Sequence, residues 1–318
     1  MKTCSVSMRT MKFRVSAAGI SLAVAAGIVA GAVLTTHTAH ARTHVRAVMK
    51  HLLVVTVTKG FRHDSIPVAE ETIQKLGDDT KYWDTDFVRT DEEMRTKMTP
   101  DALKKYDAVV FANTTGVLPL PDPQGFLDYI RSGHGFAAMH SGSDTFHEWP
   151  GQTGGVSAYV EMLGGEFLTH HAQSAVDAHI LDPNNPATRP LMRASASVEK
   201  GAQLTNLKQG SHVTGNTWHV FDEIYLFKNN DRTKVHVLLS MDKYPDDGSP
   251  EANHPGEHLL AWCKSYGTGR VFYTELGHRQ EMWHDPLYQQ HVLGGLAFAL
   301  GLAKGSTKLS PALTAAAK

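Results

Sequence analysis

An unbroken apolar run at residues 52–57 constrains the fold of this chain more than any other feature of its sequence. The run is rich in β-branched residues and has no polar side, so it predicts a strand that is buried on both faces. Strands of this kind are typical of parallel sheets with helices on both sides. Apolar segments predict two more strands, at residues 107–113 and 136–139, and a weakly alternating segment predicts another at residues 82–89.

Capping signals predict helices between these strands. Ser65 can cap a first helix, with Pro67 in its first turn and Gly77 at its end. A short helix begins after Thr99, and residues 122–132 form a third. This alternation predicts right-handed β–α–β units and an α/β fold, a mostly parallel, doubly wound sheet in three layers. In such sheets, ligands bind outside the carboxyl ends of the strands.

The second half of the chain is less regular and predicts additions to the sheet, with an antiparallel edge. Residues 159–163 are expected to be helical, and residues 286–301 to form a last amphipathic helix. The tail at residues 303–318 is rich in Ala, Ser and Thr and is predicted to be disordered. Further strands are predicted at residues 175–181, 222–228, 235–241, 259–264 and 270–275.

The first 41 residues have the organisation of an export signal. A basic segment without acidic residues precedes an apolar run at residues 15–34. Ala39-His40-Ala41 then gives the small-x-small pattern that signal peptidase recognises. This predicts cleavage after Ala41 and a periplasmic or secreted protein without a stable membrane span. An uncleaved anchor is the alternative, because the apolar run approaches the roughly 20 residues that cross a bilayer.

Removal of residues 1–41 changes the charge balance. The segment holds four of the 31 basic residues and none of the 32 acidic ones, which leaves a net charge of −5. This balance argues against a nucleic-acid partner, which needs a basic face. Residues 42–302 are long enough to form one large domain. Cys263 is then the single cysteine left, and its apolar neighbours predict a buried thiol.

Seventeen histidines remain after residue 41, and several follow predicted strands. His140, His170 and His278 come from separate strand ends and could together bind a divalent metal such as Zn²⁺ or Mn²⁺, because neutral imidazole is a common ligand. The sequence has no His-Glu-x-x-His motif, so the ligands would have to come from distant segments. The alternative is that each histidine is a surface or hydrogen-bonding residue.

The segment Ala138-Met139-His140-Ser141-Gly142 has the form of a strand-to-helix elbow. In the Gly-x-Ser-x-Gly elbow the central residue is the nucleophile, but here it is His140, and Ser141 is displaced by one position. A conventional serine hydrolase is therefore poorly supported. His140 and His278 are the main catalytic candidates, with Asp144 and Glu223 as carboxylates that could orient them or point into the site.

Polar and aromatic residues near these loops suggest a sugar as ligand. Trp149 and Trp283 flank loops that contain histidine and aspartate, and sugars stack on such rings. Arg62, His63 and Ser141 are expected to contact the substrate, since their side chains can hydrogen-bond hydroxyl groups. The alternative interpretations are core packing for the tryptophans and capping or solvated positions for the charged residues.

Four ordered motifs resemble the ThuA-like (trehalose-utilisation) domain over residues 50–301. They are Val57-Thr58-Lys59-Gly60-Phe61-Arg62-His63, Gly135–Phe146, Phe221-Asp222-Glu223-Ile224-Tyr225 and Gly269–His278. The resemblance implies a flavodoxin-like, class I glutamine amidotransferase-like fold. His140 stands where true amidotransferases have the catalytic cysteine, and no His-x-Glu follows at His278. The resemblance therefore implies that glutamine amidotransferase activity is absent.

Members of this family are tied to the catabolism of disaccharides, including oxidised 3-keto sugars. The resemblance therefore predicts an exported hydrolase, lyase or isomerase that acts on a disaccharide or its keto derivative through acid–base or metal-assisted chemistry. A non-catalytic carbohydrate-binding protein on a degenerate scaffold is the main alternative. A metal-dependent hydrolase of another ester or amide is a third. The expected partner is a small carbohydrate, and homo-oligomerisation is left open.

Overall fold

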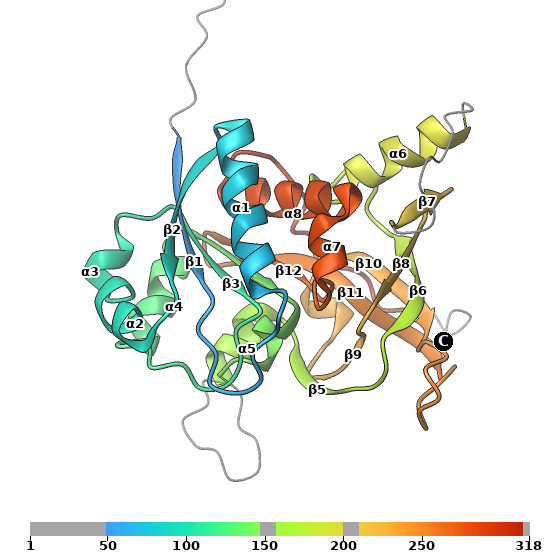
Figure 1. The fold of residues 1–318 in the computed structure, drawn as a ribbon, viewed down its shortest axis with the longest axis horizontal. Coiled ribbons are helices and arrows are strands. Elements are labelled where there is room, and N and C mark those ends of the chain that lie inside the picture. Colours follow the sequence, from blue (N-terminus) through green and yellow to red (C-terminus); the bar gives the residue numbers. More distant parts are fainter. Residues whose placement is uncertain (1–48, 147–156, 200–209, 314–318) are drawn as a thin grey trace, which may run out of the picture. The chain divides into compact units, whose positions relative to one another are not determined.

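The computed structural model describes residues 49–146, 157–199 and 210–313, and its main sheet has ten strands (Figure 1). Five of them are parallel, in the order β2-β1-β3-β4-β12. Their order matches the flavodoxin-like doubly wound sheet that the alternation predicts. Their bounds are β1 (Lys50–Val55), β2 (Trp83–Val88), β3 (Ala108–Ala112), β4 (Gly135–Met139) and β12 (Gly269–Thr274).

The other five strands continue the sheet beyond β12 with antiparallel pairing, in the order β11-β10-β6-β8-β7. This confirms the predicted antiparallel addition. The bounds are β6 (Ser174–Ile180), β7 (His212–Thr214), β8 (Thr217–Asp222), β10 (His236–Lys243) and β11 (Pro255–Tyr266). A separate antiparallel pair consists of β5 (Glu166–His170) and β9 (Tyr225–Lys228).

Helices cover both faces of the parallel strands, as the apolar strands require. Along β1, Leu52 and Val54 join one buried cluster, while Leu53 and Val55 join another on the opposite face. The first cluster includes side chains of α1 (Ile66–Thr80) and α8 (Pro286–Ala299), and the second those of α4 (Pro123–Arg131) and α5 (Ser157–Leu163). The remaining helices are α2 (Asp91–Lys97), α3 (Pro100–Leu103), α6 (Arg189–Glu199) and α7 (Gln280–His284).

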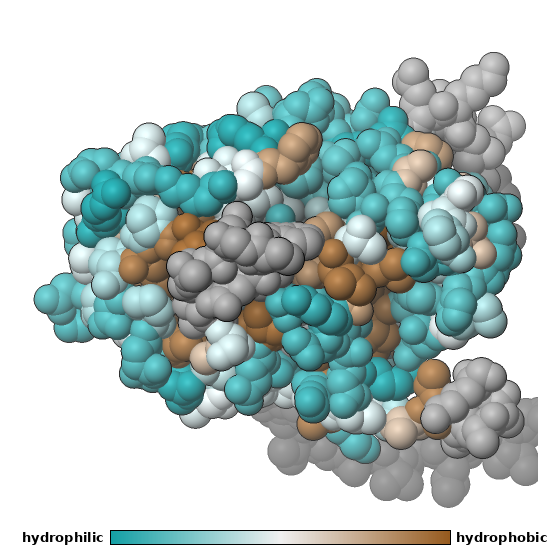
Figure 2. Space-filling view, turned by 90° about the horizontal axis from the view of Figure 1, so that it is seen from below, coloured by the Kyte–Doolittle hydropathy of each residue, from teal (hydrophilic) through white to brown (hydrophobic). Residues whose placement is uncertain are grey.

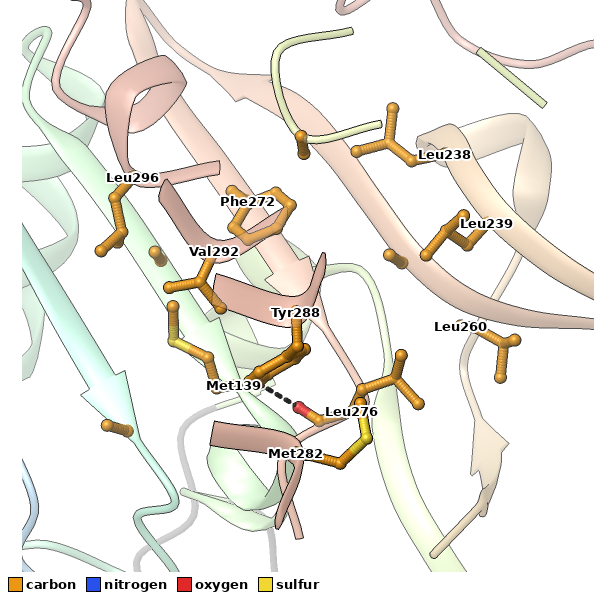
Figure 3. Close-up of a cluster of buried hydrophobic side chains, with 14 of the residues drawn as sticks. Met139, Leu238, Leu239, Leu260, Phe272, Leu276, Met282, Tyr288, Val292 and Leu296 are labelled. Carbon is orange, nitrogen blue, oxygen red and sulfur yellow. Dashed lines mark hydrogen bonds between the residues drawn. The ribbon is translucent and has the colours of Figure 1, made fainter. Parts of the chain in front are cut away.

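Part of the first cluster packs around the segment that follows β12, where Leu276, Met282 and Tyr288 lie close together (Figure 3). There the hydroxyl of Tyr288 on α8 donates a hydrogen bond of 2.7 Å to the backbone carbonyl of Leu276. Met282 on α7 packs in the same cluster. Contacts with α7 and α8 in the core therefore fix the position of the segment that follows β12.

Several elements differ from the sequence predictions. Gly77 does not end α1, which continues to Thr80. A Cβ at position 77 would lie 2.5 Å from the Trp83 ring, so this glycine allows helix and strand to approach. The predicted strand at 222–228 is wrong, because β8 ends at Asp222 and β9 starts at Tyr225. The last helix is buried on most sides rather than amphipathic.

The tail also differs from the expectation of disorder as far as it is described. The Ser310 backbone amide donates to the Val235 carbonyl at 2.9 Å, and the Ser310 hydroxyl accepts from the Val237 amide at 3.0 Å. Cys263 is fully buried, as predicted, and its thiol donates to the Ser306 carbonyl at 3.2 Å. The predicted export signal and the cleavage site after Ala41 lie outside the described residues. Among the described helices, none is long and apolar enough to cross a membrane.

Candidate functional site

His140 is the first residue after β4 and occupies the centre of a tight strand-to-helix elbow. A 3₁₀ helix follows at once (His140–Asp144), and His140 itself has a φ of 46°. This left-handed conformation costs a residue other than glycine roughly 1–2 kcal/mol. The turn also needs Gly142, because a Cβ there would lie 2.7 Å from that of Ala138. Backbone strain of this kind is concentrated at functional sites.

The two ring nitrogens of His140 have different surroundings. Nδ1 donates a hydrogen bond to the Glu275 carbonyl at 2.8 Å, so the lone pair of Nε2 is directed toward the other site residues. The Tyr225 hydroxyl donates to Nε2 at 2.7 Å, and burial raises the Tyr225 pKa well above its ordinary value. A metal ion at Nε2 would take the lone pair that accepts from Tyr225, and the backbone carbonyl on Nδ1 is a usual second-shell partner of a metal-binding histidine.

Three further side chains complete a cluster around His140 Nε2. His63 comes from the loop after β1, Glu223 from the break between β8 and β9, and His278 from the segment after β12. One donor atom from each of His63, His140, Glu223 and His278 lies within 4.8 Å of every other. Four separate segments of the chain thus converge on one point at the carboxyl edge of the sheet.

Three of the donor atoms have nearly equal spacing. His140 Nε2 lies 3.2 Å from His278 Nδ1 and 3.5 Å from Glu223 Oε2, and the last two atoms are 3.1 Å apart. A tetrahedral zinc ion with ligand distances of about 2.0–2.1 Å holds its donors about 3.3 Å apart. The three atoms therefore have the spacing of one face of a metal coordination sphere.

His63 lies against both of the other histidines. Its ring makes edge contacts with His140 and His278, with centroid distances of 4.8 and 5.1 Å. Burial, together with the neighbouring charges of His140 and His278, lowers the His63 pKa from 6.5 to about 2. His63 is therefore neutral at physiological pH, which is the form that binds a metal.

Glu223 supplies the negative charge of the cluster. Burial alone would raise its pKa, but the neighbouring imidazoles of His140, His170 and His278 hold the pKa far below its ordinary value. The carboxylate is therefore ionised. Three imidazoles and one carboxylate in a buried pocket form a donor set that suits Zn²⁺ and Mn²⁺.

A second group of polar residues fixes the segment that carries His278. Buried Asp222 accepts hydrogen bonds from the backbone amides of Gly277 at 2.7 Å and Arg279 at 3.3 Å. The Asn113 side chain, at the end of β3, donates to the Gly277 carbonyl at 3.0 Å. Hydrogen bonds to the residues on both sides thus hold His278 in place, as second-shell groups do in metal sites.

The predicted residues outside this cluster take different positions. His170, expected as a metal ligand, is not in the four-donor group, because its Nδ1 lies 3.0 Å from the other Glu223 oxygen, and its side chain is half-exposed. Ser141 is buried, with its hydroxyl 3.3 Å from His63 Nδ1. Arg62 donates to the Thr56 carbonyl at 2.9 Å and so holds its own loop. Asp144 ends the 3₁₀ helix, outside the four-donor group.

Of the two predicted aromatic platforms, the structure describes Trp283. It is fully buried, and its indole nitrogen donates to the Gly277 carbonyl at 2.9 Å, as in the alternative interpretation of core packing. Core packing overrides its position next to a polar loop. Trp149, together with Glu148, lies outside the described residues.

Sequence reasoning missed three residues that shape the site: Asn113, Tyr225 and Glu275. Asn113 has a φ of 54°, so an asparagine at the end of a buried strand was the available signal. Tyr225 ends the motif Phe221-Asp222-Glu223-Ile224-Tyr225, but its residue type and position predict no role. Glu275 acts through its backbone carbonyl, which no sequence pattern reveals.

Comparison with known proteins places the chain among related sequences and folds. The family model described as "ThuA: Trehalose utilisation" matches residues 51–299. A comparison with curated proteins gives no match.

Solved structures of similar fold include a ThuA-like protein from Parabacteroides merdae ATCC 43184, with 16% identity and a TM-score of 0.56 over 84% of this chain and 94% of that one. A ThuA-like protein from Bacteroides uniformis ATCC 8492 has 17% identity and a TM-score of 0.53, over 79% and 91%. A cytoplasmic protein from Salmonella typhimurium LT2 has 15% identity and a TM-score of 0.50, over 79% and 99%. At these identities, the similarity is informative about the fold alone.

Proposed function

The chain belongs to the ThuA (trehalose utilisation) family, and from that premise we propose that it is an enzyme of carbohydrate breakdown whose four-donor cluster binds a divalent metal ion. The cluster consists of His63, His140, Glu223 and His278. The substrate class that the family suggests is a disaccharide or its 3-keto derivative. Zn²⁺ and Mn²⁺ are the candidate ions, because imidazole and carboxylate donors suit both.

This proposal depends on the spacing of three donor atoms: His140 Nε2, His278 Nδ1 and Glu223 Oε2. Distances of 3.1–3.5 Å between atoms from three distant segments suit coordination to one ion. Hydrogen bonding alone would explain one or two such contacts, but His140 already uses Nδ1 on a backbone carbonyl. His63 completes the set as a fourth ligand or as a neutral base beside the substrate.

Such a site supports proton transfer on a keto sugar. A bound metal ion would polarise the sugar carbonyl, which makes the hydrogen on the neighbouring carbon more acidic. A neutral imidazole can accept that proton, and the electron pair of the broken C–H bond moves onto the carbonyl oxygen. Return of the proton at another carbon gives isomerisation. Departure of the glycosidic oxygen, once protonated, gives elimination.

His170 has a place in this chemistry outside the ligand set. Its Nδ1 lies 3.0 Å from Glu223 Oε1, the carboxylate oxygen outside the four-donor group. Its half-exposed ring therefore links that carboxylate to solvent. The hydrogen bond that it donates to Glu223 raises its pKa above the ordinary value. We assign it the exchange of protons with bulk water, rather than the metal-binding role that its sequence position suggested.

Turnover measurements test the proposal. The purified chain is assayed with trehalose and 3-ketotrehalose, with and without EDTA, and again after Zn²⁺ or Mn²⁺ is restored. His140→Ala should lose turnover and bound metal together. His51→Ala is the matched control, since His51 is an exposed histidine on the same parallel sheet, at the amino end of β1.

Two outcomes would contradict parts of the account. Sugar binding without any turnover, with or without metal, would support a carbohydrate-binding protein and exclude the enzyme. Full turnover in His140→Ala would exclude the cluster as the reacting site.

Export is proposed on the sequence alone. The basic segment, the apolar run and Ala39-His40-Ala41 support cleavage after Ala41 and a periplasmic or secreted protein. Edman sequencing of the mature chain should begin at Arg42. A cytoplasmic chain that keeps its first residues would overturn this proposal without affecting the metal site.

A further inference from the structure

Phe61 has an unusual position for a large apolar side chain. It is 68% exposed, the highest value among the large hydrophobic side chains of the described residues. Its ring lies 4.9 Å from that of His63, in an edge-to-face contact. The exposed side chain of Phe61 is therefore a direct neighbour of His63, one of the four residues of the cluster.

The backbone around Phe61 is held in place although the ring is exposed. The Thr115 hydroxyl donates to the Phe61 carbonyl at 2.9 Å and accepts from the Gly60 amide at 3.1 Å. The Arg62 guanidinium anchors the next residue to the Thr56 carbonyl. An apolar ring presented to solvent on a fixed backbone is a preorganised contact surface, which lowers the entropic cost of binding.

A polar cavity of about 370 Å³ lies beside the same loop, and His278 lines it. Its other lining residues are Asp64, Gln173, Arg279, Gln280 and Glu281. The Gln280 side chain donates to the Asp64 carbonyl at 3.4 Å, which joins the loop of Phe61 to the segment of His278. The volume is in the range of small-ligand sites.

The lining of this cavity matches the chemistry of sugar hydroxyls. Carboxylates accept hydrogen bonds from hydroxyl groups, guanidinium donates to them, and amides do both. Among the described residues that line the cavity there is no Phe, Tyr or Trp, so the apolar face of a sugar ring would need a surface next to it. Phe61, three residues before Asp64, supplies such a surface.

The carboxyl-edge side of the molecule fits this arrangement. Figure 2 is seen from below Figure 1, the side on which the parallel strands end, and shows hydrophobic residues gathered within a largely hydrophilic surface. A mixture of apolar and hydrogen-bonding surface at the mouth of a site is typical of carbohydrate recognition, because a pyranose has apolar faces and a polar rim.

We propose that Phe61 and the polar cavity beside His278 form the carbohydrate subsite, in which one sugar ring stacks on Phe61 and its hydroxyl groups bond to Asp64, Gln173 and Arg279. This inference rests on the proposed function and specifies where its substrate binds. It places the reacting carbon of the sugar next to His63 and His278. Substrates that lack a second ring are then expected to bind more weakly.

Substitution of Phe61 tests the subsite. Phe61→Ala should weaken the binding of trehalose and 3-ketotrehalose about tenfold, measured by calorimetry on the metal-loaded chain, and should raise KM more than it lowers kcat. Phe61→Trp should restore binding, because stacking needs an aromatic face and not phenylalanine itself. Tyr82→Ala is the control, since Tyr82 is an exposed aromatic residue directly before β2, at the amino ends of the strands.

The outcomes separate this inference from the proposed function. If wild type turns over the sugar and Phe61→Ala binds it equally well, the subsite is excluded while the function stands. If Phe61→Ala loses its metal as well, the role of Phe61 is structural and the subsite is again excluded. If wild type binds neither sugar, the proposed substrate class and the subsite fail together.

Discussion

Two regions of the molecule each contain a fully buried histidine, and they differ in what the second ring nitrogen meets. His140 and His291 are both 0% exposed, and each donates Nδ1 to a backbone carbonyl, of Glu275 and Ala187 respectively. Around His140 Nε2 lie the Tyr225 hydroxyl and the donor atoms of Glu223 and His278.

Around His291, by contrast, lie the aromatic rings of Trp218, Phe272 and Tyr288, with centroids 5.5–6.3 Å away. His291 Nε2 has no hydrogen-bond partner among the described residues. Burial of a histidine is therefore not informative by itself. The difference lies in whether its free nitrogen faces other ligand atoms or a hydrophobic core. We expect His140 to serve chemistry and His291 to serve packing.

The largest expected effect concerns the carboxylate of the His140 region. Glu223→Gln removes the negative charge that lies beside three imidazoles. It should lower turnover about a thousandfold, because metal-site electrostatics contribute several kcal/mol to catalysis. Steady-state kinetics with added metal measures this. Glu166→Gln is a matched control, since Glu166 is also a buried carboxylate with an amide and a lysine partner, on β5. Equal losses of turnover in both variants would show that the effect of Glu223→Gln is not specific to the four-donor cluster.

The next effect separates packing from chemistry. His291→Ala should lower the free energy of unfolding by about 3 kcal/mol, because it opens a cavity in the aromatic cluster beneath α8. Chemical denaturation measures this change. The variant should bind metal with unchanged stoichiometry at temperatures where it is folded. If metal binding were lost from folded His291→Ala, the two regions would be coupled.

A pH dependence follows from the burial of His291. Burial lowers its pKa from 6.5 to about 4, against the opposing hydrogen bond to Ala187. The unfolded state then takes up a proton that the folded state does not, so stability is lost as pH falls through 6.5 toward 4. Between pH 8 and pH 5 the loss is about 2 kcal/mol.

The pH effect is measured as the difference between wild type and His291→Phe. This variant cannot be protonated at the position, so its free energy of unfolding should fall less steeply with acid. Other titrating groups, including His63, contribute equally to both proteins and cancel. Parallel curves for the two proteins would show that the His291 environment does not disfavour its charged form.

The smallest effect concerns the hydrogen bond to His140. Tyr225→Phe removes the hydroxyl that lies 2.7 Å from His140 Nε2. A metal ion on Nε2 would displace that hydrogen bond, and the hydroxyl would then contact the other groups of the site, so its loss should lower turnover about tenfold, in the range found for groups around a metal site. The fold should be unaffected, because the ring remains. Tyr159→Phe is the control, since the Tyr159 hydroxyl is also buried and bonds to the Gly142 carbonyl. A larger loss in the control would point to rigidity of the elbow instead.

Sequence patterns were sufficient for the parallel half of the fold and weaker beyond it. Strands β3 and β4 are buried along their whole length, and β1 is buried from Leu52 onward, so their apolar composition is enough to predict them. The segment at 222–228 was misjudged, because Asp222 and Glu223 turn the chain between two sheets, and this break depends on the distant partners Gly277 and His278. A break that depends on distant residues produces no periodic pattern of apolar residues in the local sequence.

The candidate site was foreseeable in the same uneven way. His140 and His278 could be named because strand ends of a parallel sheet share one edge. His63 was expected to bind substrate, and its place among the four donors depends on the path of the loop after β1. Trp283 shows a limit of prediction from sequence: its neighbours in the sequence are polar, but in space it is buried in the hydrophobic core.

X-ray absorption spectroscopy of the zinc-loaded chain tests the central claim, that His63, His140, Glu223 and His278 hold one metal ion. The account predicts one bound ion per chain, nitrogen and oxygen ligands at about 2.0–2.1 Å, and the outer-shell scattering of imidazole rings. The imidazole signal should weaken in His140→Ala and stay unchanged in His51→Ala. A chain that binds no zinc, or an identical spectrum for wild type and His140→Ala, would contradict it.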